Sequence, residues 1–369
     1  MSIFEQLGLA QVINASGKMT ALGASAVSED VAQALKEASQ DYVDIDEMMK
    51  FAGTVIADVT GAEDGCPTNG AAAGIVISTA AVIAGENLTY IEQLPHSDGL
   101  KNEIIIQKGQ QINFGASIAQ MVSLGGGKVI EVGQTNKVEA AHIEEAINEQ
   151  TAALIYIKSH HAVQKGMQPI ETMITIAKKH GIPLIIDAAA EEDFEEYIAM
   201  GADIVIYSGG KALEGPTSGF ICGKKELMTA CRKQYKGIGR PMKISKEGMA
   251  GLIVALKQYD DKDHDVAGQL RRMEKLCEAL KDVPGLTCSI KQDEAGREIY
   301  RANIEVDSRL AGLTAEQLLH ALETGNPAIY LRHHYVNIGI LAVDPRPLLI
   351  GQEEIIAENI KRILARGVK

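Results

Sequence analysis

A single lysine follows a short apolar run in the segment DIVIYSGGKALEGPTSGF, residues 203–220. The run Ile204–Tyr207 predicts a buried strand, and Ser208 with two glycines separates that strand from Lys211. A lysine amine in a crowded, partly dry site loses its proton readily and can then form a covalent bond with an aldehyde. The alternative is a loop lysine that only faces solvent, and this segment alone leaves both interpretations open.

Two other segments could complement such a lysine. Thr68–Gly70 leads into a run of small residues, Ala71–Gly74, that predicts a helix whose free N–H groups and positive dipole end suit a phosphate. Asp187 directly follows the apolar residues 184–186, where a buried carboxylate is costly unless it is paired. Each segment also has an ordinary explanation: close packing at the helix start, and a helix cap or a loop position for Asp187.

Taken together, the three segments predict a pyridoxal 5′-phosphate site. Gly70, Ala71 and the hydroxyl of Ser208 would hold the phosphate, and Lys211 would bind the aldehyde. Asp187 would face the protonated pyridine nitrogen as its anionic partner. Open α/β folds bind their ligands at the carboxyl ends of parallel strands, which is where these residues fall in the predicted order of elements.

Helices and strands alternate from about residue 50 to 225, which predicts an α/β fold with a mostly parallel sheet covered on both sides by helices. The predicted strands are short and rich in Val, Ile and Leu, as expected for strands buried on both faces. They are 87–91, 103–107, 128–132, 153–158, 184–187, 203–207 and 219–222. The predicted helices are 50–60, 70–84, 115–125, 139–149, 171–180 and 191–200.

After residue 240 the pattern changes to that of a smaller α+β domain. One or two long helices over 246–282 come first. The further strands are expected at 286–291, 298–306, 328–332 and 335–341, and the further helices at 314–324 and 351–366. We therefore predict two domains: residues 1–245, a large cofactor-binding domain with an N-terminal arm, and residues 246–369, a linking helix with a small C-terminal domain.

Composition narrows the classes of function. The 369 residues carry 36 Lys and Arg against 49 Asp and Glu, a net charge of −13, which argues against a nucleic-acid partner. No apolar stretch is long enough for a membrane span, and the first residues do not resemble a signal peptide. The five cysteines are widely spaced and lack a C-x-x-C motif, so we expect reduced thiols, no metal site and a cytoplasmic location.

The chain also resembles a known family over most of its length. The resemblance is carried by AALIYIKSHHAVQKGM, HGIPLIIDAAAEED and GADIVIYSGGKALEGPTSGFICGKKELM within 152–228, by VINA at 12–15 and by EVGQTN at 131–136. These segments are similar to those of the selenocysteine synthase-like branch of fold-type I pyridoxal-phosphate enzymes. The resemblance implies that fold, with Lys211 as the Schiff-base lysine and Asp187 at the pyridine nitrogen. The residues that it places around the cofactor phosphate are Asn69, Gly70, Ala71 and Ser208.

Within that branch, GKM at 17–19, KSHHAVQKGM at 158–167 and DAAAEED at 187–193 are most similar to ammonia-lyases of phosphorylated amino sugar acids. This similarity implies an α,β-elimination, a dehydration and deamination. It would convert 2-amino-2-deoxy-D-gluconate 6-phosphate into 2-dehydro-3-deoxy-D-gluconate 6-phosphate and ammonia. It also implies a homodimer or a higher homo-oligomer, because fold-type I sites are usually completed by a neighbouring subunit.

Such a reaction needs a base, an acid and cations for the anionic groups of the substrate. Lys211, freed when substrate displaces it, is the expected base. His160 and His161 follow the predicted strand 153–158 and are candidates for the acid, since histidine titrates near neutral pH. The alternative is that one histidine packs and the other is solvated.

Arginine suits a carboxylate or a phosphate because its planar fork donates two parallel hydrogen bonds. Arg332 and Arg346, near strand ends of the small domain, are the candidates for the substrate carboxylate, although Arg346 could only brace its Pro-rich turn. Lys18 is a candidate for the sugar-phosphate end, together with Lys165 and Arg240. The cofactor ring needs a stacking residue, and Gln110 is our candidate for that position.

Three other functions remain open. The chain could be a pyridoxal-phosphate enzyme that acts on another hydroxy amino acid. It could be a selenocysteine synthase-like protein acting on aminoacyl-tRNA, although it lacks the extra N-terminal domain and the basic surface expected for that partner. It could also be a scaffold that has lost catalysis, although the presence of Lys211, Asp187 and Ser208 argues against this.

Overall fold

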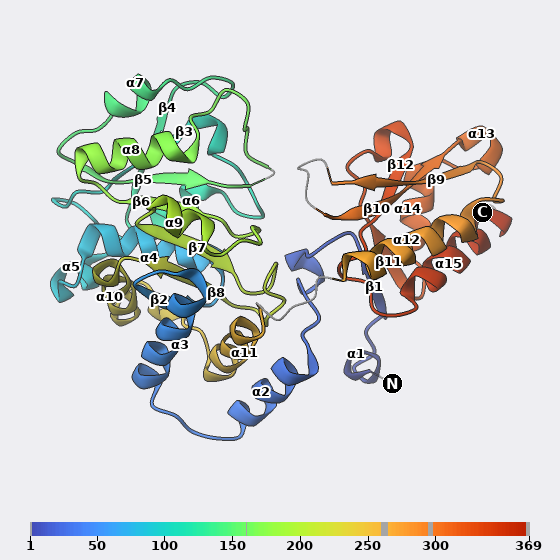
Figure 1. The fold of residues 1–369 in the computed structure, drawn as a ribbon, viewed down its shortest axis with the longest axis horizontal. Coiled ribbons are helices and arrows are strands. Elements are labelled where there is room, and N and C mark those ends of the chain that lie inside the picture. The colour runs from blue at the N-terminus through green and yellow to red at the C-terminus, as the bar shows by residue number, and fades with distance from the viewer. Residues whose placement is uncertain (1, 160, 260–264, 294–297, 367–369) are drawn as a thin grey trace. The chain divides into compact units, whose positions relative to one another are not determined.

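The computed structural model describes residues 2–159, 161–259, 265–293 and 298–366, which fold as two compact units (Figure 1). The larger unit spans Ser25–Asp261, and the smaller unit joins Met1–Ala24 to Lys262–Lys369. This division differs at both boundaries from the predicted one, 1–245 and 246–369.

Strand pairing and helix packing explain both differences. Strand β1 (Val12–Ala15) pairs in parallel with β11 (Ala328–Leu331), so the N-terminal arm belongs to the smaller unit. Helix α11 (Lys246–Lys257) packs on α2 (Glu29–Ser39) and α3 (Ile45–Thr60), so it belongs to the larger unit rather than linking the two. Neither contact is visible in local sequence patterns, since each joins segments that lie far apart in the chain.

A seven-stranded sheet forms the centre of the larger unit, in the order β2-β8-β7-β6-β5-β3-β4. Its strands are β2 (Asp64–Thr68), β3 (Glu103–Gln107), β4 (Lys128–Val132), β5 (Thr151–Ile157), β6 (Leu184–Asp187), β7 (Ile204–Ser208) and β8 (Gly219–Gly223). Strands β3 to β7 run parallel, and β8 runs antiparallel between β7 and β2. The side chains of β5 and β6 are buried on both faces, which explains their continuous apolar runs.

Helix α4 (Ala71–Ala84) crosses the sheet and is almost entirely buried. It contacts strands β7 and β8, and α6 (Ile118–Leu124) and α10 (Lys225–Lys233) pack against it. Gly74 permits this close packing, because a Cβ atom there would lie 2.6 Å from Cγ2 of Ile206. The other elements of this unit are α5 (Leu88–Gln93), η2 (Lys108–Gln110), α7 (Ala140–Glu144), α8 (Ile170–His180), α9 (Glu196–Met200), η3 (Gln234–Lys236) and η4 (Arg240–Met242).

The predicted α/β architecture is confirmed, with local differences; helix α7, for example, ends at Glu144 rather than at 149. Residues 87–91 form the start of helix α5 rather than a strand, because the Asn87 side chain accepts the N–H of Tyr90 at 3.2 Å and caps a helix. Strand β2 was not predicted, because DGCPT lacks an apolar run. It lies at the sheet edge beside β8, where Pro67 is tolerated. The helix expected over 191–200 begins only at Glu196, because the Asp193 carboxylate accepts the N–H groups of Glu195 and Glu196.

The smaller unit is the predicted α+β fold. Strands β9 (Leu286–Gln292), β10 (Tyr300–Val306) and β12 (Ile340–Val343) form an antiparallel sheet in the order β12-β10-β9, beside the β1–β11 pair. Its helices are α1 (Ile3–Gln6), η1 (Thr20–Leu22), α12 (Val266–Leu280), α13 (Ser308–Ala311), α14 (Ala315–Glu323), η5 (Val336–Ile338) and α15 (Gln352–Arg366). The strand predicted over 335–341 therefore starts later than expected, after the turn η5. The predicted mostly parallel sheet and the predicted smaller α+β unit are thus both present.

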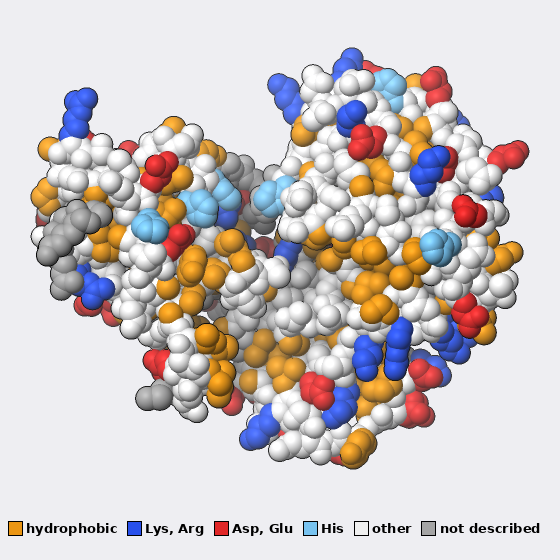
Figure 2. All heavy atoms as spheres, turned by 180° about the vertical axis from the view of Figure 1, so that it is seen from behind, with side chains coloured by type: hydrophobic (Ala, Val, Ile, Leu, Met, Phe, Trp, Pro, Cys, Tyr) orange, Lys and Arg blue, Asp and Glu red, His pale blue; other side chains and the backbone are white. Residues whose placement is uncertain are grey.

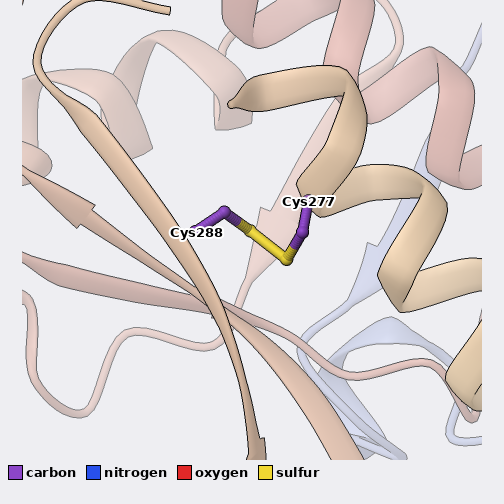
Figure 3. Close-up of a disulfide and its surroundings, with 2 residues drawn as sticks. All are labelled: Cys277 and Cys288. Atoms are coloured by element: carbon purple, nitrogen blue, oxygen red, sulfur yellow. A yellow bond between two sulfur atoms is a disulfide. The ribbon is translucent and has the colours of Figure 1, made fainter. Parts of the chain in front are cut away.

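The cysteines correct one expectation. Cys277 and Cys288 form a disulfide that joins helix α12 to strand β9 (Figure 3). The helix packs on that strand and brings the two Cα atoms to 5.1 Å, a normal separation for a disulfide. The other three cysteines, Cys66, Cys222 and Cys231, are free and buried, as expected for reduced thiols.

The surface carries charges of both signs. Figure 2 shows acidic and basic side chains interspersed over one face, with hydrophobic side chains gathered in patches between them. No helix of the described residues is long and apolar enough to cross a bilayer.

The disulfide predicts a simple thiol count. Denatured without reductant, the protein should react with three equivalents of iodoacetamide, and after reduction with five. In the control variant Cys277→Ser, four thiols should react under both conditions. Intact-protein mass spectrometry reads the count directly, and five reactive thiols before reduction would show that the bond does not form.

Candidate active site

The carboxyl ends of β5, β6 and β7 bring the predicted cofactor residues together in the larger unit. Asp187, the last residue of β6, lies between Ile157 of β5 and Ile206 of β7 in the strand register. Lys211 follows the end of β7 by three residues. The lysine and the carboxylate therefore come from neighbouring strand ends, as the sequence predicted.

Asp187 is a buried carboxylate whose charge is supported by this lysine. Asp187 is 8% exposed, and burial is the main reason why the pKa of its carboxyl group is raised to about 6. The positive charge of Lys211 and the N–H of Ala189, 3.2 Å from Oδ1, act in the opposite direction and favour the charged form. The buried carboxylate of Asp187 is therefore suited to bind a second cation, which would neutralise its negative charge together with Lys211.

The amine of Lys211 is half-buried and has no hydrogen-bond partner among the described residues. Its loop, in contrast, is held at several points. The N–H of Gly209 donates to the carbonyl of Ser218 at 2.9 Å, and the N–H of Gly215 donates to the carbonyl of Gly209 at 2.7 Å. The hydroxyl of Ser25 donates to the carbonyl of Gly210 at 2.9 Å. The backbone is thus fixed while the reactive amine is available.

The start of α4 forms a candidate phosphate cradle. Gly70 is the N-cap residue and supplies no side chain to the free N–H groups of the first turn. The hydroxyl of Thr68 donates to the carbonyl of Gly70 at 3.0 Å and so stabilises the turn that precedes the helix. Asn69 is exposed at its tip. An uncapped N-terminus on a long buried helix is a suitable place for an anion.

Strand register brings Ser208 to the same cradle. Gly219 of β8 pairs with Ser208 on one side and with Thr68 on the other. A Cβ atom on Gly219 would lie 2.6 Å from the carbonyl carbon of Gly70 and 2.8 Å from the nitrogen of Ala71. Glycine is therefore required here for the loop to approach β8. The hydroxyl, the helix N-terminus, the lysine and the carboxylate form a donor set that fits a phosphorylated pyridine aldehyde.

Two other candidates of the larger unit have different surroundings. His160 lies outside the described residues. His161 is exposed on the loop after β5, and its backbone N–H donates to the hydroxyl of Ser159 at 3.2 Å. Gln110 is fully buried, and its Oε1 accepts the N–H of Ile157 at 3.1 Å. This gives Gln110 the geometry of a brace between two strand ends, without the exposed face of a residue that stacks on a ring.

In the smaller unit, Arg332 and Arg346 lie in a cluster around Asp344. The carboxylate of Asp344 is fully buried and accepts from Nε of Arg301 at 2.9 Å and from Nη2 of Arg346 at 2.9 Å. Burial alone would raise the pKa of Asp344, but these arginines outweigh it and hold the pKa at about 2. Arg301 also donates to Asp293 at 2.6 Å. Arg346 is thus a partner of Asp344, consistent with the bracing alternative.

Arg332 is different, because its guanidinium has no hydrogen-bond partner among the described residues. It is half-buried, and burial and the nearby charge of Arg301 lower its pKa. Among the described residues, the cluster holds three arginines against two carboxylates, so its net charge is positive. Gly17 lies beside them: a Cβ atom there would be 3.9 Å from Nη1 of Arg332. Lys18 follows in the same turn and is half-buried.

Three supporting residues were missed by the sequence reasoning: Gly219, Arg301 and Asp344. Gly219 could have been found from its small size, because a glycine lets a neighbouring phosphate loop approach closely. Asp344 stands directly after an apolar strand, as Asp187 does, and the same argument about a buried carboxylate applied to it. Arg301 sits within a strand without any local signal.

Comparisons with known proteins agree on the family of this chain and include relatives with two different activities. The family model described as SelA, L-seryl-tRNA selenium transferase, matches residues 12–306. A D-glucosaminate-6-phosphate ammonia lyase from Salmonella typhimurium is 42% identical over 98% of both chains. A 5′-C-glycyluridine monooxygenase-decarboxylase from a Streptomyces species is also 42% identical, over 98% of this chain and 92% of that protein.

Solved structures agree with these relatives. A structure of D-glucosaminate-6-phosphate ammonia-lyase superposes with a TM-score of 0.95, at 42% identity and over 99% of both chains. The serine palmitoyltransferase of Sphingomonas wittichii has a TM-score of 0.56 at 14% identity, over 97% of this chain and 87% of that one. The second likeness shows the fold alone.

The raised pKa of Asp187 predicts a stability effect in the cofactor-free protein. The folded state keeps a proton on Asp187 up to about pH 6, whereas an unfolded aspartate loses it near 3.8. Folding therefore loses stability as the pH rises from about 4 to 6, by at most about 3 kcal/mol. Asp187→Asn should remove this loss and make the cofactor-free protein more stable at pH 8, measured by urea unfolding across pH.

The exposed Asp98→Asn supplies the matched control, which should leave the pH profile unchanged. A profile for Asp187→Asn that parallels the unsubstituted protein between pH 4 and 8 would contradict a strained buried carboxylate.

Proposed function

Because this chain belongs to the SelA family of pyridoxal-phosphate enzymes, we propose that it binds pyridoxal 5′-phosphate through Lys211 and acts as an ammonia-lyase on 2-amino-2-deoxy-D-gluconate 6-phosphate. The products would be 2-dehydro-3-deoxy-D-gluconate 6-phosphate and ammonia. The observation that carries the proposal is the electrostatic attraction between Lys211 and a buried carboxylate, Asp187, in a unit that also has an uncapped helix N-terminus at Gly70. The full-length similarity to the Salmonella ammonia lyase supports the choice of substrate.

Asp187 and the cradle would hold the cofactor. The carboxylate of Asp187 would keep a proton on the ring nitrogen, and the N–H groups at Gly70 and Ala71 with the hydroxyl of Ser208 would bind the phosphate. When bound, pyridoxal 5′-phosphate withdraws electrons from the α-carbon of an attached amino acid and makes its α-hydrogen acidic. The positive charge that Asp187 maintains on the ring strengthens that withdrawal.

The elimination needs two proton transfers by side chains. The free amine of Lys211 would accept the proton from C2. The C3–O bond then breaks, and His161 would donate a proton so that the oxygen leaves as water. One water is later consumed when the C2–N bond is hydrolysed to the 2-oxo acid and ammonia. The overall change is therefore the loss of ammonia alone.

The anionic ends of the substrate would be bound by cations. Arg332 is the best candidate for the carboxylate, because its guanidinium carries the surplus charge of the Asp344 cluster and has no partner among the described residues. We retain Lys18 as a candidate for the phosphate end, and Arg346 as a second ligand or as a brace for Asp344.

A second candidate function is an oxygen-dependent decarboxylation. It is favoured by the equal identity to the Streptomyces monooxygenase-decarboxylase over almost the whole chain. That chemistry would consume dioxygen and release carbon dioxide, whereas the ammonia-lyase reaction needs no oxygen. Action on aminoacyl-tRNA is less favoured, because the chain is strongly acidic.

We further propose that the protein is cytoplasmic and that it forms a homo-oligomer, as in the sequence-based prediction.

Lys211 is tested by chemical trapping. The protein reconstituted with pyridoxal 5′-phosphate should be yellow, and borohydride should fix the cofactor on the peptide that contains Lys211. Lys211→Ala should lose the fixed label and at least about 10³-fold of kcat. Peptide mapping by mass spectrometry reads the site, with Lys165→Ala as a control that keeps the label. Label on another lysine would refute the assignment.

The reaction is tested by its products. With 2-amino-2-deoxy-D-gluconate 6-phosphate, the protein should release equal amounts of 2-oxo acid and ammonium, at the same rate with and without air. Arg332→Lys should raise KM by about tenfold or more, because it loses bidentate binding. Oxygen uptake with carbon dioxide release from a glycyl-nucleoside would instead establish the second candidate.

A further inference from the structure

The turn that follows strand β1 lies beside Arg332 in the smaller unit. Strands β1 and β11 pair in parallel, with Ala15 opposite Leu331 (Figure 1). Gly17 and Arg332 follow these two strand ends and are therefore at the same edge of the pair. The N–H of Asp344 adds a second link, because it donates to the carbonyl of Ala15 at 2.8 Å. The N-terminal arm thus borders the arginine cluster.

The side chain of Asn14 fixes this turn at two points. Its Nδ2 donates to the carbonyl of Gly17 at 2.8 Å, and its Oδ1 accepts the N–H of Ser16 at 3.0 Å. The N–H of Met19 also donates to the carbonyl of Gly17, at 2.9 Å. We call residues 16–19 the arm turn. Its backbone position is determined largely by Asn14.

Gly17 leaves an open space next to two guanidinium groups. A Cβ atom at this position would lie 3.9 Å from Nη1 of Arg332, 4.0 Å from Nη2 of Arg346 and 3.7 Å from Oδ2 of Asp344. These are ordinary contact distances, so a methyl group would fit there and would fill the space that the two guanidinium groups share. With glycine, the same space can accept an atom of a ligand.

Asp344 cannot neutralise Arg332 through hydrogen bonds. Its Oδ1 accepts the N–H and Nε–H of Arg346, at 3.2 and 3.0 Å. Its Oδ2 accepts Nη2 of Arg346 and Nε of Arg301, each at 2.9 Å. A carboxylate has about four acceptor positions, so those of Asp344 are filled. The guanidinium of Arg332 consequently has no hydrogen-bond partner among the described residues.

Two donors of the arm turn are also unused. Ser16 is 7% exposed, yet its hydroxyl has no hydrogen-bond partner within the described ranges. The N–H of Gly17 likewise has none in the described part of the chain. Buried polar groups are normally paired, because an unpaired one loses the hydrogen bonds that water would give it. A guanidinium, a hydroxyl and an N–H in adjacent positions suit an oxyanion.

We propose that the arm turn completes the site at which Arg332 binds the carboxylate of the substrate. The carboxylate occupies the space beside Gly17 and accepts hydrogen bonds from Arg332 and from the hydroxyl of Ser16. Asn14 is a positioning residue that holds the turn in place. This inference rests on the proposed function, and it adds that residues 14–17 make the protein select an acid over the corresponding alcohol.

Two ligands that lack the reacting amine isolate the contribution of the carboxylate. D-Gluconate 6-phosphate has a hydroxyl in place of the amine of the proposed substrate. D-Glucitol 6-phosphate has, in addition, a CH₂OH group in place of the carboxylate. Calorimetry with the protein reconstituted with pyridoxal 5′-phosphate gives both dissociation constants, and their ratio is the carboxylate preference. The unsubstituted protein should prefer the gluconate at least about tenfold.

Three substitutions should lower this preference. Gly17→Ala should bring the ratio close to one, because its methyl group fills the space of the carboxylate. Ser16→Ala should lower the ratio by about fivefold, and it removes a hydroxyl that makes no internal hydrogen bond. Asn14→Ala should lower it without weakening D-glucitol 6-phosphate. A purely structural defect of the arm would instead weaken both ligands equally.

Gly23→Ala is the matched control. Gly23 lies in the same arm with a φ angle of +85°, against +119° for Gly17, so alanine strains the backbone at both positions. A Cβ atom on Gly23 would meet no heavy atom within 4 Å, so the preference should stay unchanged. If Gly17→Ala fails to fold, as judged by circular dichroism, Ser16→Ala and Asn14→Ala decide the result.

The proposal is overturned if the unsubstituted protein shows no carboxylate preference, or if the deciding variants keep the ratio unchanged. Binding of both ligands with an unchanged ratio leaves the proposed function intact, since only the role of the arm turn is then wrong. If the unsubstituted protein binds neither ligand, the proposed substrate is wrong and this role of the arm turn is wrong with it.

Discussion

The attraction between Lys211 and the buried carboxylate of Asp187 is the interaction on which the site depends. A carboxylate out of water costs several kcal/mol unless a cation lies near it, and burial does raise the pKa of this one. The protein can support that charge only because β6 and β7 are neighbours and end at the same edge of the sheet. The strand order, the apolar runs that bury the strands and the packing of α4 over them all serve this placement.

The smaller unit also contains a buried carboxylate, but there the pKa is lowered instead of raised. Asp344 is also buried, yet its pKa is held at about 2, because Arg301 and Arg346 donate hydrogen bonds to it. One carboxylate is therefore left short of positive charge, and the other sits in an excess of it. The first arrangement suits a cationic ring, and the second leaves Arg332 to attract an anion.

Sequence reasoning predicted the parts of this protein that local chemistry determines. Apolar runs gave the central strands, and the types of Lys211, Asp187 and Ser208 gave the cofactor hypothesis. The prediction was wrong where contacts between distant segments determine the structure. Strand β2 forms because it pairs with β8, and β1 belongs to the smaller unit because it pairs with β11. The Cys277–Cys288 bond likewise follows from helix α12 packing on β9, which the cysteine spacing does not reveal. The sequence position of Asp187 also fitted a loop residue, and only its burial in the structure argues against that alternative.

The reversed strand β8 has a consequence for motion. Since β8 runs antiparallel to β7, the loop that carries Lys211 leaves the sheet at Ser208 and re-enters it at Gly219, directly opposite. Both ends of the loop are thus tied by the same ladder of hydrogen bonds, and Gly209 extends that ladder to Ser218. The two ends of the Lys211 loop therefore cannot move apart unless β7 and β8 separate inside the central sheet.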